Sequence, residues 1–137
     1  MGKKTEGGSP LNQKVNFKNG MMDGIYESYF TNSFIGEYES LDVPPLRVKG
    51  NYKNNKKEGL WIEYYETKDL VFLKENFKDG KRHGLTTSYW PSGKITRSYK
   101  YYEDKPVDGN DISYWEDGKV MYEANYKNGE IEGRYNE

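Results

Sequence analysis

The stretch NFKDGKRHG, residues 76–84, decides the fold because its spaced glycines recur along the chain. Close copies are NFKNGMMDG from Asn16, NYKNNKKEG from Asn51 and NYKNGEIEG from Asn125. We interpret the first dipeptide of each copy as a chain reversal, because Gly and Asn adopt positive φ at low cost, and the second glycine as the tight entry into the next strand. The reversals are Asp79-Gly80, Asn19-Gly20 and Asn128-Gly129, with Asn54-Asn55 and Lys105-Pro106 in two deviating copies.

Three markers follow one period of about 25 residues. The second glycines lie at residues 24, 59, 84, 109 and 133, and single aromatic residues lie at 17, 52, 77, 102 and 126. Such a period indicates a repeat architecture whose units stack on one another. The first interval is ten residues longer. We assign the surplus to a loop insertion at about residues 31–50, where Pro44-Pro45 would interrupt a strand ladder. The aromatic pairs keep the same step: Tyr29-Phe30, Tyr64-Tyr65, Tyr89-Trp90 and Tyr114-Trp115.

Each unit is typical of a β-hairpin, because segments rich in Tyr, Trp, Ile, Val and Thr alternate with turn residues. In the clearest unit, LTTSYW (85–90) and KITRSYKYYE (94–103) flank the turn PSG. The sequence therefore predicts an all-β fold, an elongated twisted antiparallel sheet of about five hairpin repeats. Residues 1–14 are expected to form a flexible lead and residues 15–137 the repeat domain, with repeats starting near residues 16, 51, 76, 101 and 125.

Composition supports folding and excludes several partners. The hydrophobic fraction is only 34%, but 14 Tyr, 3 Trp and 5 Phe supply large buried areas. The formal net charge of −1 argues against a nucleic-acid partner, which a strongly basic field would attract. The absence of Cys excludes disulfides and thiolate metal sites. Without an apolar signal-peptide stretch, a cytoplasmic location is favoured for the chain as given, and an exported one if a leader was removed.

The pattern in NFKDGKRHGLTTSYWPSGK and NYKNNKKEGLWIEYY resembles the MORN repeat, most closely the bacterial MORN-variant repeat of YwqK-type proteins labelled antitoxins. The resemblance covers the chain from about Val15 to its end. It implies a twisted sheet of hairpins, often with a curved face lined by aromatic rings. The fourth copy, YYEDKPVDGND, departs from the pattern, and the fifth stops at GRYNE before completing its hairpin.

The aromatic pairs are the first candidates for a partner-binding surface. Adjacent strand residues point to opposite faces, so we expect the first ring of each pair on one face and the second ring on the other. The C-terminal sheet edge, around residues 122–135 and including Tyr122 and Tyr126, is expected to dock a partner strand or a second copy. The candidate residues in the pairs are Tyr64, Tyr65, Tyr89, Trp90, Tyr114 and Trp115.

Other polar residues support no catalytic, metal or cofactor site. His83, the only histidine, is interpreted as a solvated loop residue. The matched residues Asp23, Glu58, Asp108 and Glu132 are interpreted as exposed turn residues, with an acidic ridge as the alternative. Lysines beside the turns could meet phosphate, but we favour a role in discouraging sheet aggregation. They are Lys53, Lys56, Lys57, Lys78, Lys81 and Lys127.

The sequence thus predicts a non-enzymatic protein–protein interaction module without a cofactor. The resemblance narrows this to an antitoxin or immunity-type inhibitor that binds a toxin. The alternative function is a peripheral membrane- or lipid-binding scaffold of the MORN type, which the near-neutral charge does not favour.

Overall fold

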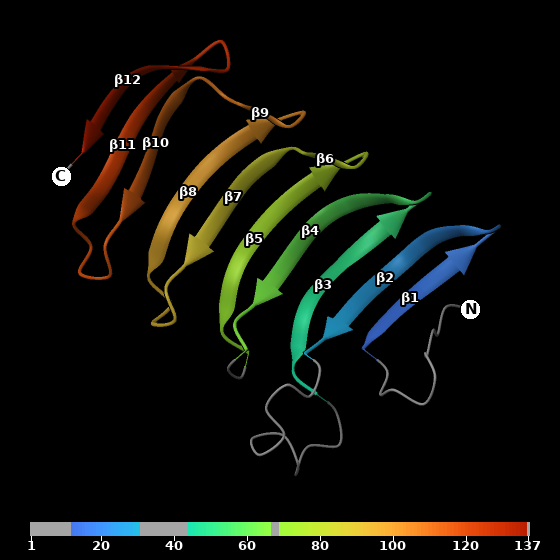
Figure 1. Ribbon diagram of the computed structural model, residues 1–137. Helices are drawn as coiled ribbons and strands as arrows, with labels where there is room; N and C mark the ends of the chain where they lie inside the picture. Colours follow the sequence, from blue (N-terminus) through green and yellow to red (C-terminus); the bar gives the residue numbers. More distant parts are fainter. Residues whose placement is uncertain (1–11, 31–43, 67–68, 137) are drawn as a thin grey trace.

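The computed structural model describes residues 12–30, 44–66 and 69–136, and these form one open antiparallel sheet without a helix (Figure 1). Neighbouring strands follow the order β1-β2-β3-β4-β5-β7-β8-β10-β11-β12, while β6 pairs with β5 and β9 with β8. The predicted all-β fold of successive hairpins is confirmed. The strands are β1 (Gln13–Lys18), β2 (Met21–Tyr29), β3 (Leu46–Lys53), β4 (Lys56–Tyr64), β5 (Val71–Lys78), β6 (Lys81–Arg82), β7 (Gly84–Tyr89), β8 (Ile95–Tyr102), β9 (Lys105–Pro106), β10 (Gly109–Tyr114), β11 (Val120–Lys127) and β12 (Glu130–Asn136).

The chain reversals lie at the predicted dipeptides, because both central residues have positive φ. In the opening stretch, φ is 49° at Asp79 and 81° at Gly80. This geometry twists a two-residue turn in the same sense as its strands. The expectation for the fourth copy is wrong: Glu103 and Asp104 make the turn, with φ of 46° and 67°, and Lys105-Pro106 forms β9.

In the first four copies, the second glycine opposes an aromatic residue on the next strand along the chain. Cross-strand pairs join Gly24 to Tyr52, Gly59 to Phe77, Gly84 to Tyr101 and Gly109 to Tyr126. Tyr101, not Tyr102, therefore holds the aromatic position of the fourth copy. These glycines also have positive φ, and at Gly84 the side chain of Asn76 packs on the space a Cβ would occupy. Both features favour glycine at this position.

Three of the turns that reverse the chain between repeats are held by a carboxylate of the copy before them. The carboxylates of Asp23, Glu58 and Asp108 accept hydrogen bonds from the backbone N–H groups of Asn54, Asp79 and Asn128, respectively. Backbone bonds add to this contact, since Gly80 N–H donates to Lys57 O over 2.9 Å. These carboxylates thus connect consecutive repeats by hydrogen bonds. The sequence had predicted only that they are exposed turn residues.

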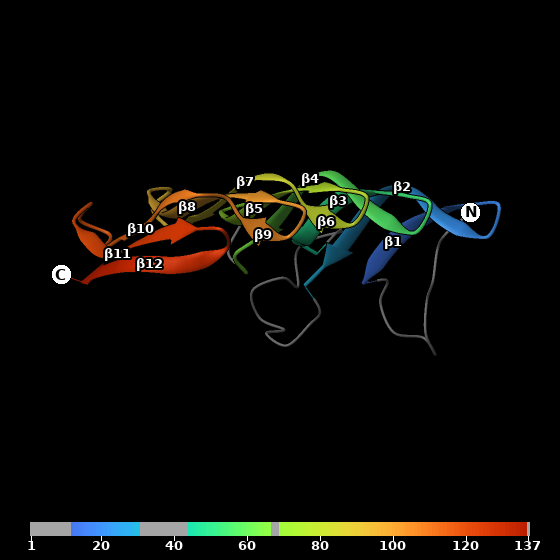
Figure 2. The same ribbon diagram turned by 90° about the horizontal axis from the view of Figure 1, so that it is seen from above.

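The sheet is a single layer, as Figure 2 shows from above. The described strands therefore bury side chains only against those of neighbouring strands in the same sheet. Register shifts recur where each aromatic pair begins, at Tyr29, Tyr64, Tyr89 and Tyr114. Such irregularities bend a strand and increase its local twist. In the described part of the chain, no helix is long and apolar enough to cross a membrane.

Two expected boundaries differ from the structure. Strand β1 begins at Gln13, so the last two residues assigned to the lead belong to a strand, and residues 1–11 lie outside the described residues. The expected insertion at 31–50 overlaps β3, which begins at Leu46 directly after Pro44-Pro45. A proline that precedes a strand costs no ladder hydrogen bond. The remainder of that insertion, residues 31–43, also lies outside the described residues.

Candidate functional site: the aromatic face

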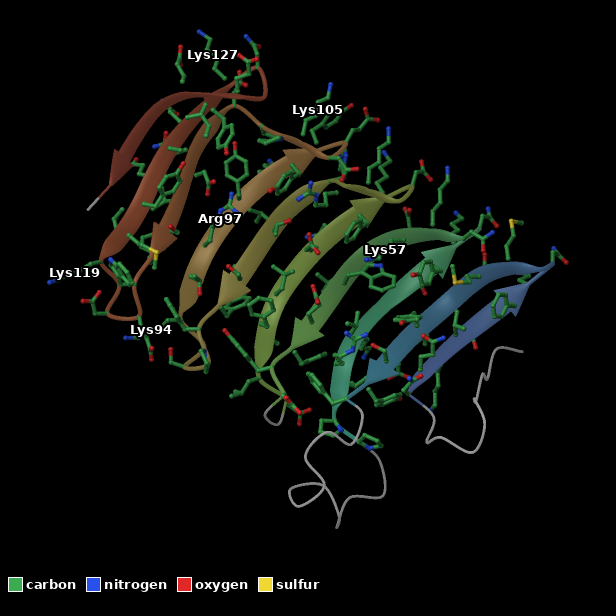
Figure 3. All side chains as sticks on the ribbon, viewed as in Figure 1. Lys57, Lys94, Arg97, Lys105, Lys119 and Lys127 are labelled. Carbon is green, nitrogen blue, oxygen red and sulfur yellow. The ribbon has the colours of Figure 1, made fainter. Side chains whose placement is uncertain are left out.

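One face of the sheet, here called the aromatic face, carries most of the buried side chains. Residues paired across antiparallel strands share a face, and this face carries the pairs Tyr26–Gly50, Trp61–Glu75, Thr86–Tyr99 and Asp111–Ala124. Trp61, Tyr99, Asp111 and Ala124 of this central row are buried. In Figure 3, Lys57 and Arg97 lie over the sheet, while Lys94, Lys105, Lys119 and Lys127 lie at its rims.

The N-terminal half of the aromatic face is a cluster of four rings centred on Trp61. Its ring lies 5.5 Å from that of Tyr26 and 5.0 Å from that of Tyr52, and 6.4 Å from Phe77. The indole lies over Gly50, where a Cβ would overlap it. Nε1 of the indole donates to Asn51 O over 3.1 Å. The largest side chain of the face therefore lies against the smallest residue.

Cationic side chains lie over rings of the aromatic face. Nζ of Lys57 is 4.6 Å from the Trp61 ring centroid and 4.9 Å from that of Phe77. The guanidinium carbon of Arg82 is 4.2 Å from the Tyr101 ring centroid. Lys57 and Arg82 occupy equivalent positions, opposite Tyr52 and Phe77. Aromatic and cationic side chains thus alternate along one row of the face.

The C-terminal half of the aromatic face is built around an ion pair whose carboxylate is buried. Nε of Arg97 donates to Oδ1 of Asp111 over 2.7 Å, and Nη2 donates to Oδ2. This hydrogen bonding holds the pKa of Arg97 above its usual value. The pair joins β8 to β10, two strands whose ladder contains only the pairs Ile112–Ser98 and Ser113–Arg97.

Three tyrosines surround this ion pair. The Tyr99 ring lies 5.5 Å from Tyr101 and 5.3 Å from Tyr126, and its hydroxyl donates to Val107 O over 2.5 Å. Burial, reinforced by the charge of Asp111, raises the pKa of Tyr99 to about 12. Tyr99 therefore remains a hydrogen-bond donor up to strongly alkaline pH.

A polar strip separates the two halves. Burial raises the pKa of Glu75 above its usual value, against the opposing effects of Arg82 and Lys57. Beside it, a cavity of about 60 Å³ is lined by Leu73, Thr86, Ser88, Arg97, Tyr99 and Tyr101. This volume holds a water molecule or the tip of a side chain.

The two columns of rings expected from strand alternation require both rings of each aromatic pair to lie within a strand. Strands β4, β7 and β10 end at Tyr64, Tyr89 and Tyr114, so the second ring of each pair lies in the following turn. Two of the second rings connect consecutive repeats. The Tyr65 hydroxyl donates to Tyr89 O over 2.6 Å, and Nε1 of Trp90 donates to Tyr114 O over 3.1 Å. Their contacts are thus structural in the chain itself.

Trp90 and Trp115 form a matched pair for a stability test. Trp90 is half-buried and hydrogen-bonded, whereas Trp115 is 48% exposed. We expect Trp90→Ala to lower the free energy of unfolding by about 2–3 kcal/mol and Trp115→Ala by less than about 1 kcal/mol. Urea denaturation followed by circular dichroism measures both. Equal losses would show that the Trp90 bond to the next repeat contributes little.

Tyr122 and Tyr126 lie away from the sheet edge. Both belong to β11, which pairs with β10 on one side and β12 on the other. These two tyrosines are therefore not edge residues. Strand β12 forms the C-terminal edge of the described sheet, and docking of a partner strand or a second copy at that edge stays a prediction. Tyr126 instead contributes its ring to the C-terminal half of the aromatic face.

His83 is half-buried between β6 and β7, with its ring 5.0 Å from that of Tyr102. Its Nδ1 is buried without a hydrogen-bond partner in the described part of the structure. His83 takes the place of the carboxylates that hold the next turn in other copies, and there Asp104 accepts a hydrogen bond from Arg82 N–H instead. That bond, with the Arg82 side chain, lowers the pKa of Asp104. Among the described residues, no group of three or more His, Asp or Glu side chains could hold a metal ion.

The family model of the MORN repeat variant matches residues 82–104 and 108–128. These two segments are MORN repeat variants. Each matched MORN repeat variant carries one aromatic pair and ends at the turn that reverses the chain, Glu103-Asp104 or Asn128. The MORN repeat is generally a non-enzymatic binding repeat. Comparisons with curated proteins and with solved structures give no significant match.

Sequence reasoning missed the central row of the aromatic face. Trp61 occupies a position held by Tyr26, Thr86 and Asp111 in other copies, so no common residue type marks it. Arg97 and Asp111 likewise have no counterparts of the same charge in the other repeats. The one signal in the sequence that could have found this row is spacing. Its residues lie two positions after a second glycine, or on the strand paired with that position.

Proposed function

We propose that this chain is a non-enzymatic module that binds another protein through the aromatic face. The observation that carries the proposal is the row of half-buried rings and cations on one side of a single-layer sheet. Tyr, Trp and Arg dominate the binding energy of protein interfaces, because they combine apolar area with hydrogen-bonding groups.

The geometry favours a polypeptide over a small molecule. Tyr52, Phe77, Tyr101 and Tyr126 repeat across alternate strands, about 10 Å apart by ordinary strand spacing. A partner that lies along this row meets several equivalent ring and cation positions at once. Its carboxylates would face Lys57 and Arg82, and its apolar side chains the rings between them.

As the narrower proposal, the partner is a toxin and the chain acts as its antitoxin or immunity-type inhibitor. The support for this is the likeness of the repeats to those of bacterial antitoxin-labelled proteins. An inhibitor of this kind needs only a complementary surface that covers the partner's working site, and a rigid repeat sheet supplies one.

The test is direct binding to the protein encoded by the neighbouring gene, measured by isothermal titration calorimetry. Lys57→Glu is expected to weaken binding at least tenfold, because it reverses a charge between two rings of the aromatic face. Lys74→Glu on the other side of the sheet is the matched control and should leave the affinity unchanged. For the narrower proposal, co-expression should relieve growth arrest caused by that protein.

The proposal fails if Lys57→Glu binds with unchanged affinity while circular dichroism shows it folded. Binding without relief of growth arrest would contradict only the inhibitor role.

A further inference from the structure

The side of the sheet opposite the aromatic face carries a second ordered pattern. Continuous cross-strand pairing shows which residues share this opposite face, since paired residues point the same way. The ladder joins Lys14, Glu27, Lys49, Ile62, Lys74, Thr87, Ser98, Ile112 and Glu123. Residues two positions away along each strand lie on the same side.

An aliphatic row runs along this opposite face. Ile25, Leu60 and Leu85 each follow a second glycine, and each lies two residues before a member of the ladder. Their side chains are 55%, 48% and 54% exposed. They lie on β2, β4 and β7, which alternate with β3 and β5 in the sheet, so neighbours in the row are about 10 Å apart.

Three lysines lie beside the aliphatic row. Lys49, Lys74 and Lys100 lie on β3, β5 and β8, and Lys100 is paired with Leu85. Lys49 and Lys74 are paired with Ile62, two residues along β4 from Leu60. The residues paired with Ile25 and Leu60 are Asn51 and Asn76. In the described part of the chain, none of the three forms an ion pair with a carboxylate. Nζ of Lys74 is 5.7 Å from the Tyr89 ring centroid.

Nearby carboxylates do not cancel this charge. Glu63 and Glu75 belong to the aromatic face, because they pair with Leu73 and Trp61 on that side. Glu58 accepts a hydrogen bond from Asp79 N–H in the next turn. Glu27 lies beside Lys49 at one end of the row, between it and Lys14. The middle of the opposite face is therefore both apolar and positively charged.

We propose that the opposite face docks an acidic amphipathic helix of another protein, lying across the strands. Seven residues of an α-helix advance about 10.5 Å, which matches the step of the aliphatic row. Apolar residues at seven-residue intervals would contact Ile25, Leu60 and Leu85. Acidic residues beside them would pair with the three lysines. This inference goes beyond the proposed function, which concerns the aromatic face.

The probe is a synthetic helical peptide with leucines seven residues apart and glutamates flanking each one, labelled for fluorescence anisotropy. Matched peptides carry glutamine or lysine in place of the glutamates. The acidic peptide should bind, and its affinity should fall as salt rises. The glutamine peptide should bind at least tenfold more weakly, and the lysine peptide should not bind measurably.

Variants locate the site on the full chain. Lys74→Glu and Leu60→Ser should each weaken binding of the acidic peptide at least tenfold, with the fold checked by circular dichroism. Lys57→Glu on the aromatic face should leave that affinity unchanged, the reverse of its effect on the proposed protein partner. The two proposals therefore fail separately.

Other occupants would overturn the inference. One such result is that phosphatidylserine vesicles bind in a Lys74-dependent manner while the acidic peptide does not. Another is self-association in analytical ultracentrifugation that Leu85→Ser abolishes. Equal binding of all three peptides, or Lys74→Glu binding with unchanged affinity, would also contradict it.

Discussion

Gly50→Ala is expected to lower the free energy of unfolding by about 3 kcal/mol, although it adds one methyl group. The Cβ would overlap the indole of Trp61, which is 4% exposed and packed between Tyr26 and Tyr52. The ring cannot move away without disturbing these neighbours or breaking its bond to Asn51 O. Urea denaturation at neutral pH measures the loss.

A double-mutant cycle separates the overlap from other effects of alanine. Thr86 holds the position of Trp61 in the next copy, so Trp61→Thr is a replacement that the fold already uses there. Trp61→Thr alone should cost about 3–5 kcal/mol, in the range of large core truncations. In that background, Gly50→Ala should cost almost nothing, giving a coupling energy of about 3 kcal/mol. Additive losses would show that Gly50 is needed for its backbone and not for the ring.

The repeat itself was predictable because its determinants are local. Asp79-Gly80 and Asn128-Gly129 require positive φ, which few residue types accept cheaply, so the same residue types return at each reversal. Their recurrence fixes the number and order of hairpins. Packing in a single-layer sheet adds little that could override these turns, and the predicted architecture is therefore found.

The fourth copy shows where a spacing argument fails. Between Gly84 and Gly109 the spacing is 25 residues, as expected, but the turn comes one residue early at Glu103-Asp104. One extra residue near Val107 restores the spacing between the two glycines. The carbonyl of Val107 accepts a hydrogen bond from the Tyr99 hydroxyl. The early turn and the extra residue compensate for each other and leave the 25-residue period unchanged. Counting by that period therefore assigned the aromatic position to Tyr102 instead of Tyr101.

The sequence predicted the type of residue in the candidate site but not the positions of these residues. Aromatic residues do line one face, but the pairs Tyr64-Tyr65 and Tyr89-Trp90 lie at strand ends and in turns. Strand alternation could not foresee this, because the register shift at Tyr64 and Tyr89 depends on pairing with a distant strand. The central rings are placed by the fit between large and small residues on neighbouring strands, such as Trp61 over Gly50. The sequence of a single repeat does not show which residues meet in this way.

Arg97→Ala is expected to lower the free energy of unfolding by about 2–4 kcal/mol, because it leaves the carboxylate of Asp111 without its bidentate partner. Asp111 is 1% exposed, and removing one member of a buried pair leaves an uncompensated charge. The guanidinium is partly exposed, with 43% of the side-chain surface accessible, which places the cost below that of a fully buried pair. The effect should concentrate where β8 meets β10, since their ladder has only two residue pairs. Hydrogen exchange should therefore show faster exchange in β10 and β11 than in β4 and β5.

The matched variant Arg97→Ala/Asp111→Ala removes the unpaired carboxylate and should recover at least half of the lost stability. If the double variant is as unstable as Arg97→Ala, the loss comes from packing of the Arg97 stem on Tyr99 and not from the unpaired carboxylate.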